Sequence, residues 1–276
     1  MAATAASAQE IWSRGDYQKI ACEHVLVSER LCAQISLSAA CTVLDVACGT
    51  GNTALAAARR RATVSAIDIA PALIERARQR AAAEGLDGID FRVGDAGALP
   101  YPDASFDFVL STFGSSFLVD QQRAANELMR VVKPGGLIAL TAYTAQSLPS
   151  DVYRLGVSLA PPPEGAPLPA YVWTEGARAA ELLGTGCTDI QIHHASVDAC
   201  FPSAQAFFDN NARHYGPVMT RLEGYSPEQR TRFQDGMLRI LQAHNRATDG
   251  SLMAVFDYAT VVARRKADGT HARKTT

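Results

Sequence analysis

The chain has 276 residues, of which 47% are hydrophobic and 20% charged, as in a globular protein with one large domain or two small ones. Its formal net charge of −2 provides no basic field that would attract nucleic acid or an acidic membrane. Because the N-terminus lacks a signal-peptide pattern and no apolar run is long enough to span a bilayer, we expect a cytoplasmic protein without membrane or nucleic-acid partners.

The first 35 residues predict helices, since apolar residues recur at helical spacing with an interruption near Gly15. Strands and helices then alternate as far as residue 144. The predicted strands are 43–46, 63–67, 89–93, 108–111 and 137–143, and the predicted helices are 53–61, 71–84 and 121–132. This alternation of short apolar strands with helices indicates a doubly wound, mostly parallel sheet.

The pattern changes after Ala145. Residues 147–173 contain the run Pro161-Pro162-Pro163 and are predicted to be irregular. The elements predicted after them are a helix at 175–183, a strand at 188–197, a helical region at 203–247 and a last strand at 253–262. The helical insert between the last two strands, roughly fifty residues long, exceeds an ordinary loop, so we expect it to form a lid or a substrate pocket.

Together these elements predict a Rossmann-like α/β protein with a seven-stranded sheet and a helical lid inserted between the last two strands. We expect a single domain with a core and a cap, each built from three segments. The core segments are 36–144, 174–201 and 250–265, and the cap segments are 1–35, 145–173 and 202–249. The polar residues 266–276 are predicted to be a disordered tail.

The most informative motif is the stretch from Val43 to Asn52, in which an apolar run containing Asp45 leads into Gly49-Thr50-Gly51 and then into a helix. A turn without side chains lets a ligand press against the backbone. The glycines also satisfy the dinucleotide fingerprint, with Ala54 in the third place, so a nicotinamide-dependent oxidoreductase is an alternative. The Asp45 carboxylate disfavours it, because a pyrophosphate at the turn would be repelled.

Further motifs follow the next strands in order. Asp68 ends the second strand, Gly94-Asp95-Ala96 follows the third, and the segments 99–109 and 128–136 lead into the fourth and fifth strands. Each motif alone is an ordinary turn, but their order on alternating elements argues against coincidence. With the first turn, they resemble the class I S-adenosylmethionine (SAM) dependent methyltransferases, in particular the branch of ubiquinone and menaquinone C-methylases and small-molecule enzymes.

The resemblance implies SAM as cofactor, S-adenosylhomocysteine as product and a specific set of cofactor contacts. The methionine moiety is expected against the backbone of the first turn, near an acidic side chain and a serine after the fourth strand: Ala47, Gly49, Gly51, Asp45 and Ser111. Asp68, followed by Ile69, is expected to hold the ribose, and Asp95 with Ala96 the adenine. Tyr17 is expected to reach the SAM carboxylate, or else to be an ordinary packing residue.

The acceptor is expected to be a small organic molecule methylated at O, N or C. An oxygen nucleophile needs a general base, and an amine needs less. The preferred catalytic residues are His214 and Tyr215, which stand before the Gly216-Pro217 break in the insert, whereas the other candidates are His193, His194 and His244. The main alternative is a SAM-binding protein of the same fold that transfers no methyl group, such as a cyclase or a scaffold.

Metal and disulfide chemistry are not expected. The six cysteines are scattered without a Cys-x-x-Cys pair, which favours reduced, buried thiols. The sequence also lacks a His-x-x-x-His or Asp-x-Asp pattern, so we predict no metal site. A nucleic-acid methyltransferase is disfavoured as well, because the net charge is negative and no dedicated binding domain is visible.

Overall fold

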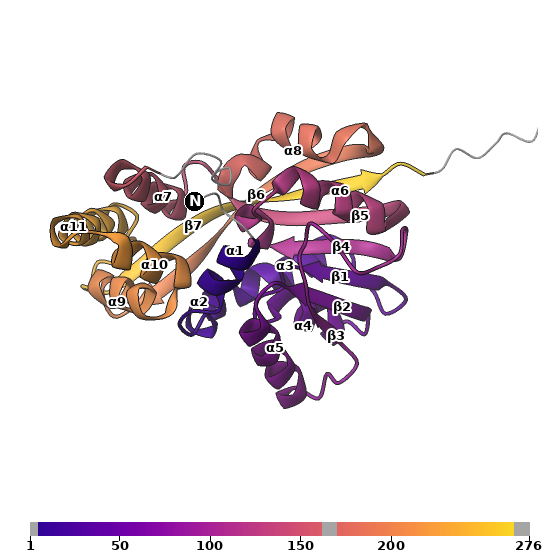
Figure 1. Ribbon diagram of the computed structural model, residues 1–276, viewed down its shortest axis with the longest axis horizontal. Coiled ribbons are helices and arrows are strands. Elements are labelled where there is room, and N and C mark those ends of the chain that lie inside the picture. Colours follow the sequence, from indigo (N-terminus) through magenta and orange to yellow (C-terminus); the bar gives the residue numbers. More distant parts are fainter. Residues whose placement is uncertain (1–4, 162–169, 268–276) are drawn as a thin grey trace, which may run out of the picture.

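The computed structural model describes residues 5–161 and 170–267, and a seven-stranded sheet runs through this part of the chain (Figure 1). The strand order is β3-β2-β1-β4-β5-β7-β6. The strands are β1 (Thr42–Val46), β2 (Thr63–Asp68), β3 (Asp90–Val93), β4 (Phe106–Thr112), β5 (Val132–Tyr143), β6 (Cys187–Phe201) and β7 (Leu252–Arg265). Strand β7 is antiparallel to both of its neighbours, and the other pairings are parallel. The prediction of a mostly parallel, seven-stranded Rossmann-like sheet is confirmed.

Helices cover both faces of the sheet, as parallel strands require (Figure 1). One face is packed by α3 (Val25–Gln34), α4 (Asn52–Arg59) and α5 (Pro71–Ala83), and the other by α6 (Gln121–Val131) and α8 (Gly176–Leu183). The alternation of side chains along β1 shows why both faces are apolar, since Val43 belongs to the first core and Leu44 to the second. Both side chains are fully buried.

A third apolar cluster lies at one end of the sheet, where the remaining helices gather (Figure 1). These are α1 (Ala5–Trp12), α2 (Gln18–Ala21), α7 (Leu148–Leu159), α9 (Ala204–His214), α10 (Gly216–Gly224) and α11 (Pro227–Ala243), with the 3₁₀ turns η1 (Cys22–His24) and η2 (Gly114–Phe117). Two further 3₁₀ turns, η3 (Ala170–Thr174) and η4 (Gly184–Gly186), flank α8. The helical insert between the last two strands is therefore present, because α9, α10 and α11 lie between β6 and β7.

The prediction of an irregular stretch at 147–173 is wrong for its first half, because Leu148–Leu159 forms α7. Pro149 lies in the first turn of this helix, where a missing N–H costs no hydrogen bond. Leu148 is buried against the third cluster, so packing stabilises the helix. Residues 162–169 and the predicted tail from 268 to 276 lie outside the described residues. In the described ranges, no helix is long and apolar enough to cross a membrane.

Candidate active site

Two adjoining cavities lie at the carboxyl ends of the parallel strands, the edge at which open α/β sheets bind ligands. The first cavity is lined by the turns that follow β1, β2, β3 and β4. The second is lined mainly by the cap, including residues of α7, α9, α10 and α11. The side chains that line both cavities are Tyr17, His24, Phe113 and Phe117.

The turn after β1 owes its shape to residues in the left-handed region. Ala47 and Gly49 have φ values of 54° and 55°, and both line the first cavity. A Cβ atom at Gly49 would lie 3.3 Å from the Tyr17 ring, a tight contact, so both space and the positive φ favour glycine there. Gly51 has a different role. It does not line either cavity, and a Cβ atom there would lie 2.8 Å from Cδ1 of Leu55.

Asp45 is completely buried and lines the first cavity. Its Oδ2 accepts a hydrogen bond of 2.9 Å from the backbone N–H of Ala54, which ties β1 to the first turn of α4. Burial raises the pKa of Asp45 to about 8, a net value that includes a lowering by the Ala54 hydrogen bond and a smaller rise from the nearby Asp68 carboxyl. A buried pair of acids facing one cavity favours a cationic ligand, because a positive charge would lower both pKa values.

Asp68 joins the turn after β1 to the turn after β2. Its Oδ2 accepts from the Gly49 N–H at 2.8 Å and its Oδ1 accepts from the Ala70 N–H at 2.9 Å. Burial raises its pKa, and hydrogen bonds from Ala70, Gly49 and Ile69 oppose the rise. The Gly49 amide thus points to a carboxylate of the protein. Asp68 and the following Ile69 both line the first cavity.

Asp95 and Ala96 line the same cavity beyond Asp68. Oδ1 of Asp95 accepts from the Gly97 N–H at 2.8 Å, and its carbonyl accepts from the Ala98 N–H at 3.0 Å. These bonds close a tight turn after β3. The structure therefore brings Asp45, Asp68 and Asp95 to one cavity from the ends of three strands.

Ser111 lies elsewhere than expected. Its hydroxyl is buried and accepts from the Ser115 N–H at 3.0 Å, and the residue lines neither cavity. Successive residues of a strand point to opposite faces, and it is Thr112 that faces the first cavity. Thr112 ends a chain of hydroxyls that sequence reasoning missed: its Oγ1 lies 2.7 Å from that of Thr53, which lies 3.0 Å from Oγ of Ser28.

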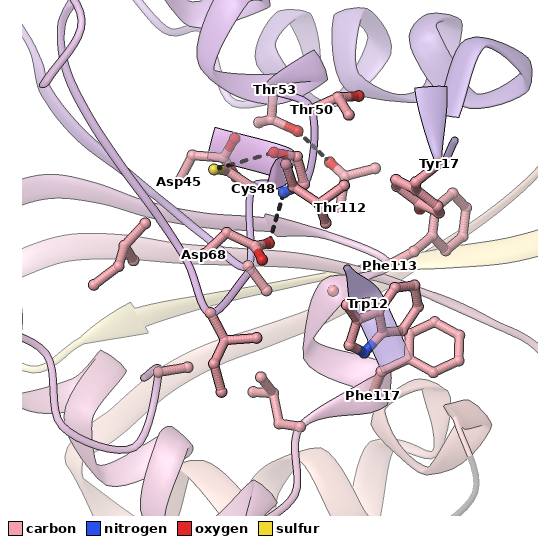
Figure 2. Close-up of a pocket in the computed structure, with 18 of the residues that line it drawn as sticks. Trp12, Tyr17, Asp45, Cys48, Thr50, Thr53, Asp68, Thr112, Phe113 and Phe117 are labelled. Atoms are coloured by element: carbon pink, nitrogen blue, oxygen red, sulfur yellow. Dashed lines mark hydrogen bonds between the residues drawn. The ribbon is translucent and has the colours of Figure 1, made fainter. Parts of the chain in front are cut away.

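An aromatic wall faces these polar groups. Figure 2 shows Trp12, Tyr17, Phe113 and Phe117 grouped on one side of the cavity, with Asp45 and Asp68 on the other. The Trp12 ring lies 5.6 Å from that of Tyr17 and 5.2 Å from that of Phe117, both edge-on. Since Trp12 and Tyr17 come from the N-terminal segment, the cap supplies part of the first cavity.

His24 is a second residue that the sequence did not reveal as part of the site. Its Nε2 lies 2.9 Å from the Tyr143 hydroxyl, and its ring packs against Phe113 and Phe256. Burial lowers the pKa of His24 to about 4, and a hydrogen bond to the Ile20 backbone only partly opposes this. The imidazole is therefore neutral at pH 7. Its position in η1 gives no sequence signal, because its partner is 119 residues away.

The structure gives different positions to the side chains of the two residues predicted to be catalytic, Tyr215 and His214. Tyr215 lines the second cavity, and its ring lies 6.2 Å from that of Tyr17 and 5.9 Å from that of Trp12. His214 lines neither cavity. Of the other histidines, His244 pairs with Asp151 at 3.0 Å and His193 bonds Gln191 on an exposed strand face.

The described residues contain no group of three or more His, Cys, Asp or Glu side chains placed to hold a metal ion. The cysteines are free thiols, and Cys48 lines the first cavity. Burial raises the pKa of the Cys48 thiol well above its usual value, and the neighbouring Asp45 and Asp68 add to the rise. Cys48 is thus a neutral wall residue.

Comparisons with known proteins agree with this geometry. Residues 44–140 match the family model described as a methyltransferase domain. An uncharacterized protein of Mycobacterium tuberculosis is 35% identical over 224 residues, which cover 78% of this chain and 79% of the relative. The demethylmenaquinone methyltransferase of Deinococcus radiodurans is 42% identical over 117 residues, covering 41% of this chain and 48% of that enzyme. The crystal structure of a proposed methyltransferase from Bacillus halodurans has a TM-score of 0.61 at 19% identity, covering 87% and 99% of the two chains.

Residues 44–140 therefore form a methyltransferase domain, and the chain is a SAM-dependent methyltransferase with SAM as its cofactor. The first cavity fits SAM on two observations. Gly49 leaves a backbone-lined wall that any side chain would fill, and the buried Asp45 and Asp68 carboxyls suit a ligand with positive charge. When bound, SAM supplies a methyl group already activated on a sulfonium sulfur.

Proposed function

We propose that the chain methylates a small organic acceptor held in the second cavity while SAM occupies the first. The observation that carries this proposal is the shared wall, because Tyr17, His24, Phe113 and Phe117 line both cavities. A methyl donor on one side and a nucleophile on the other would meet at this wall. Holding both in line and away from water is most of what such an enzyme must do.

On the cofactor side, we assign roles from the geometry of the first cavity. Asp68, with Ile69 beside it, holds the ribose, and Asp95 with Ala96 holds the adenine. The methionine end lies against Ala47 and Gly49, near Asp45 and Tyr17, as the lining of the cavity supports. Gly51 allows the turn to pack closely against Leu55, and Ser111 stabilises the η2 turn by accepting a hydrogen bond from the Ser115 N–H.

On the acceptor side, the apolar character of the second cavity supports a small organic acceptor with a hydrophobic body. The apolar side chains that line it include Leu148, Val152, Phe207, Val218, Met237 and Phe256. Tyr215 faces this space and is assigned to contact the acceptor. Because its side chain lines neither cavity, we assign no contact to His214, which keeps only a position at the end of α9.

The test is to close the second cavity without touching the first. In Val152→Trp, a larger ring on α7 enters the acceptor space. A library of small acceptors is screened with labelled SAM, and S-adenosylhomocysteine is measured by mass spectrometry. We expect wild-type turnover with at least one acceptor, and in Val152→Trp normal SAM affinity with turnover lost. Val93→Trp, at an exposed valine of β3, is the control.

Three results would oppose the proposal. SAM binding without release of S-adenosylhomocysteine by any acceptor would favour a protein of this fold that transfers no methyl group. Unchanged turnover in a folded Val152→Trp variant would place the acceptor outside the second cavity. Binding of NAD in place of SAM, measured by calorimetry, would revive the oxidoreductase alternative.

A further inference from the structure

The second cavity contains an acidic side chain that has no hydrogen-bond partner among the described residues. Glu23 lies in η1, lines this cavity and is partly buried. Its Oε1 is fully buried without a hydrogen bond, and no hydrogen bond or ion pair joins its carboxyl group to another described residue. Buried polar atoms in native proteins nearly always have a partner. The unsatisfied carboxyl group therefore points to a ligand.

The described neighbours of Glu23 do not supply a hydrogen bond to its carboxyl group. His24, next to it in the chain, uses Nε2 for the Tyr143 hydroxyl and a further bond for the Ile20 backbone. Tyr17 and Tyr143 face Glu23, and its charge adds to the burial that raises the pKa of both phenols, so neither is charged. Cys22, on the other side, is an exposed thiol whose pKa is also raised.

The cavity has a cation, but this cation does not pair with Glu23. Arg221 lines the same cavity from α10, and its guanidinium stands 5.8 Å from the centre of the Phe233 ring. Burial raises the pKa of Glu23 to about 8, and no positive charge of the described residues lowers it again. The acid lacks the cation that would make its burial favourable.

We propose that Glu23 binds a basic amine of the methyl acceptor. The inference rests on the proposed function, because it takes the second cavity as the acceptor site. An ammonium or amine group supplies both the hydrogen bonds and the positive charge that Glu23 lacks. Since His24 follows Glu23 and lines both cavities, the amine is anchored close to the shared wall. The substrate class is then an apolar molecule that carries a primary or secondary amine.

Binding of two matched probes tests the proposal without methyl transfer. The probes are 3-phenylpropylamine and 3-phenylpropan-1-ol, which share an apolar body and differ in the amine. Titration calorimetry with S-adenosylhomocysteine present gives their affinities. We expect wild type to bind the amine at least about tenfold more tightly than the alcohol, because a charge-assisted hydrogen bond is stronger than a neutral one. In Glu23→Gln this preference should disappear.

The control variant is Glu75→Gln, which neutralises an exposed glutamate on α5 and should keep the preference. The pH dependence adds a second readout. An alkylammonium stays charged to about pH 10, so amine affinity should rise between pH 6.5 and 8.5 as Glu23 ionises. In Glu23→Gln the same curve should be flat. Thermal melts check folding, and Glu23→Asp, which keeps the charge, should retain part of the preference.

The outcomes separate this inference from the proposed function. Equal affinity for both probes in wild type, no saturable amine binding, or a preference that survives in Glu23→Gln would overturn the role of Glu23. If Val152→Trp blocks both probes in those cases, the second cavity still stands as the acceptor site. If both probes bind Val152→Trp as they bind wild type, the cavity itself is wrongly assigned.

Discussion

The two cavities of the site differ in how their polar side chains are held. In the first cavity each acidic side chain is already held by a backbone N–H group: Asp45 by Ala54, Asp68 by Gly49 and Asp95 by Gly97. In the second cavity Oε1 of Glu23 is buried without a hydrogen bond to any described residue, Arg221 lies over the Phe233 ring, and the walls are mainly aliphatic and aromatic.

Because of this difference, each cavity is suited to a different kind of ligand. A preorganised polar frame loses little entropy when it binds and suits one unchanging ligand. A cavity shaped by helix packing owes its form to many side chains of α7, α9, α10 and α11, so it can be altered without disturbing the sheet. We expect changes in the first half to act on SAM affinity and changes in the second to act on the acceptor.

The largest effect is expected at the turn after β1. Gly49→Val introduces a branched side chain at a φ of 55° and against the Tyr17 ring, so SAM binding should weaken beyond about a hundredfold. Titration calorimetry with SAM measures it. Gly85→Val is the matched control, because Gly85 has a φ of 66° but nothing within 4 Å of a Cβ atom. Normal SAM affinity in a folded Gly49→Val variant would show that the turn does not contact the cofactor.

A smaller loss is expected when the ribose contact is removed. If Asp68 holds the ribose as proposed, Asp68→Ala removes charge-assisted hydrogen bonds to two hydroxyls, which should cost about 2–3 kcal/mol, or about thirty- to a hundredfold in SAM affinity. Asp90→Ala, an exposed aspartate on β3 paired with Arg92, should leave the affinity unchanged. Because Asp68 also anchors Gly49 and Ala70, a melt must show that the variant is folded. An unchanged dissociation constant would remove Asp68 from the site.

The same contrast explains how much could be predicted from the sequence. The acidic residues of the first cavity follow strands, and the turn glycines follow β1, so the local order of residues was enough to find them. The sequence could not show that Thr112, rather than the neighbouring Ser111, lines the first cavity, because successive residues of β4 point to opposite faces. The helix α7 was missed because its proline lies in the first turn, where it is compatible with a helix.

The second cavity could not be predicted in this way. Most of its residues come from α2, η1, α7, α9, α10 and α11, and they meet only when these helices pack on the sheet. The His24–Tyr143 hydrogen bond joins residues 119 positions apart, and neither residue stands in a motif. Among the predicted acceptor residues, Tyr215 faces the cavity while its neighbour His214 does not, a choice set by the turn between α9 and α10.

His24 lies at the boundary between the two cavities, and it should make the free energy of unfolding depend on pH by about 2 kcal/mol. His24 has a pKa of about 4 in the folded chain and about 6.5 when unfolded, so the unfolded chain binds more protons between these values. The stability that neutral His24 contributes is present above pH 6.5 and is lost as the pH falls toward 4. Replacement by Gln keeps an acceptor for the Tyr143 hydroxyl but does not titrate.

The measurement compares wild type with His24→Gln, because burial raises the pKa values of Asp45 and Glu23 and these acids act in the opposite direction. The difference in unfolding free energy, from urea titrations, should shift by about 2 kcal/mol against wild type between pH 7 and pH 5. A constant difference for His24→Gln would mean that the imidazole titrates normally in the folded chain.

The smallest effect is expected deepest in the acceptor half. Tyr215→Phe removes one hydroxyl from the second cavity, and the loss of one neutral hydrogen bond costs about 0.5–1.5 kcal/mol. The KM for the acceptor should therefore rise by about two- to tenfold, while SAM affinity stays unchanged because Tyr215 does not line the first cavity. His214→Ala should leave both constants near wild type, since that side chain lines neither cavity. Steady-state kinetics with an acceptor from the screen would measure both variants. If His214→Ala abolished turnover and Tyr215→Phe did not, His214 rather than Tyr215 would contact the acceptor. The turn between α9 and α10 would then have to rotate when the acceptor binds, so the cap would adapt to its ligand while the cofactor half keeps its preformed shape.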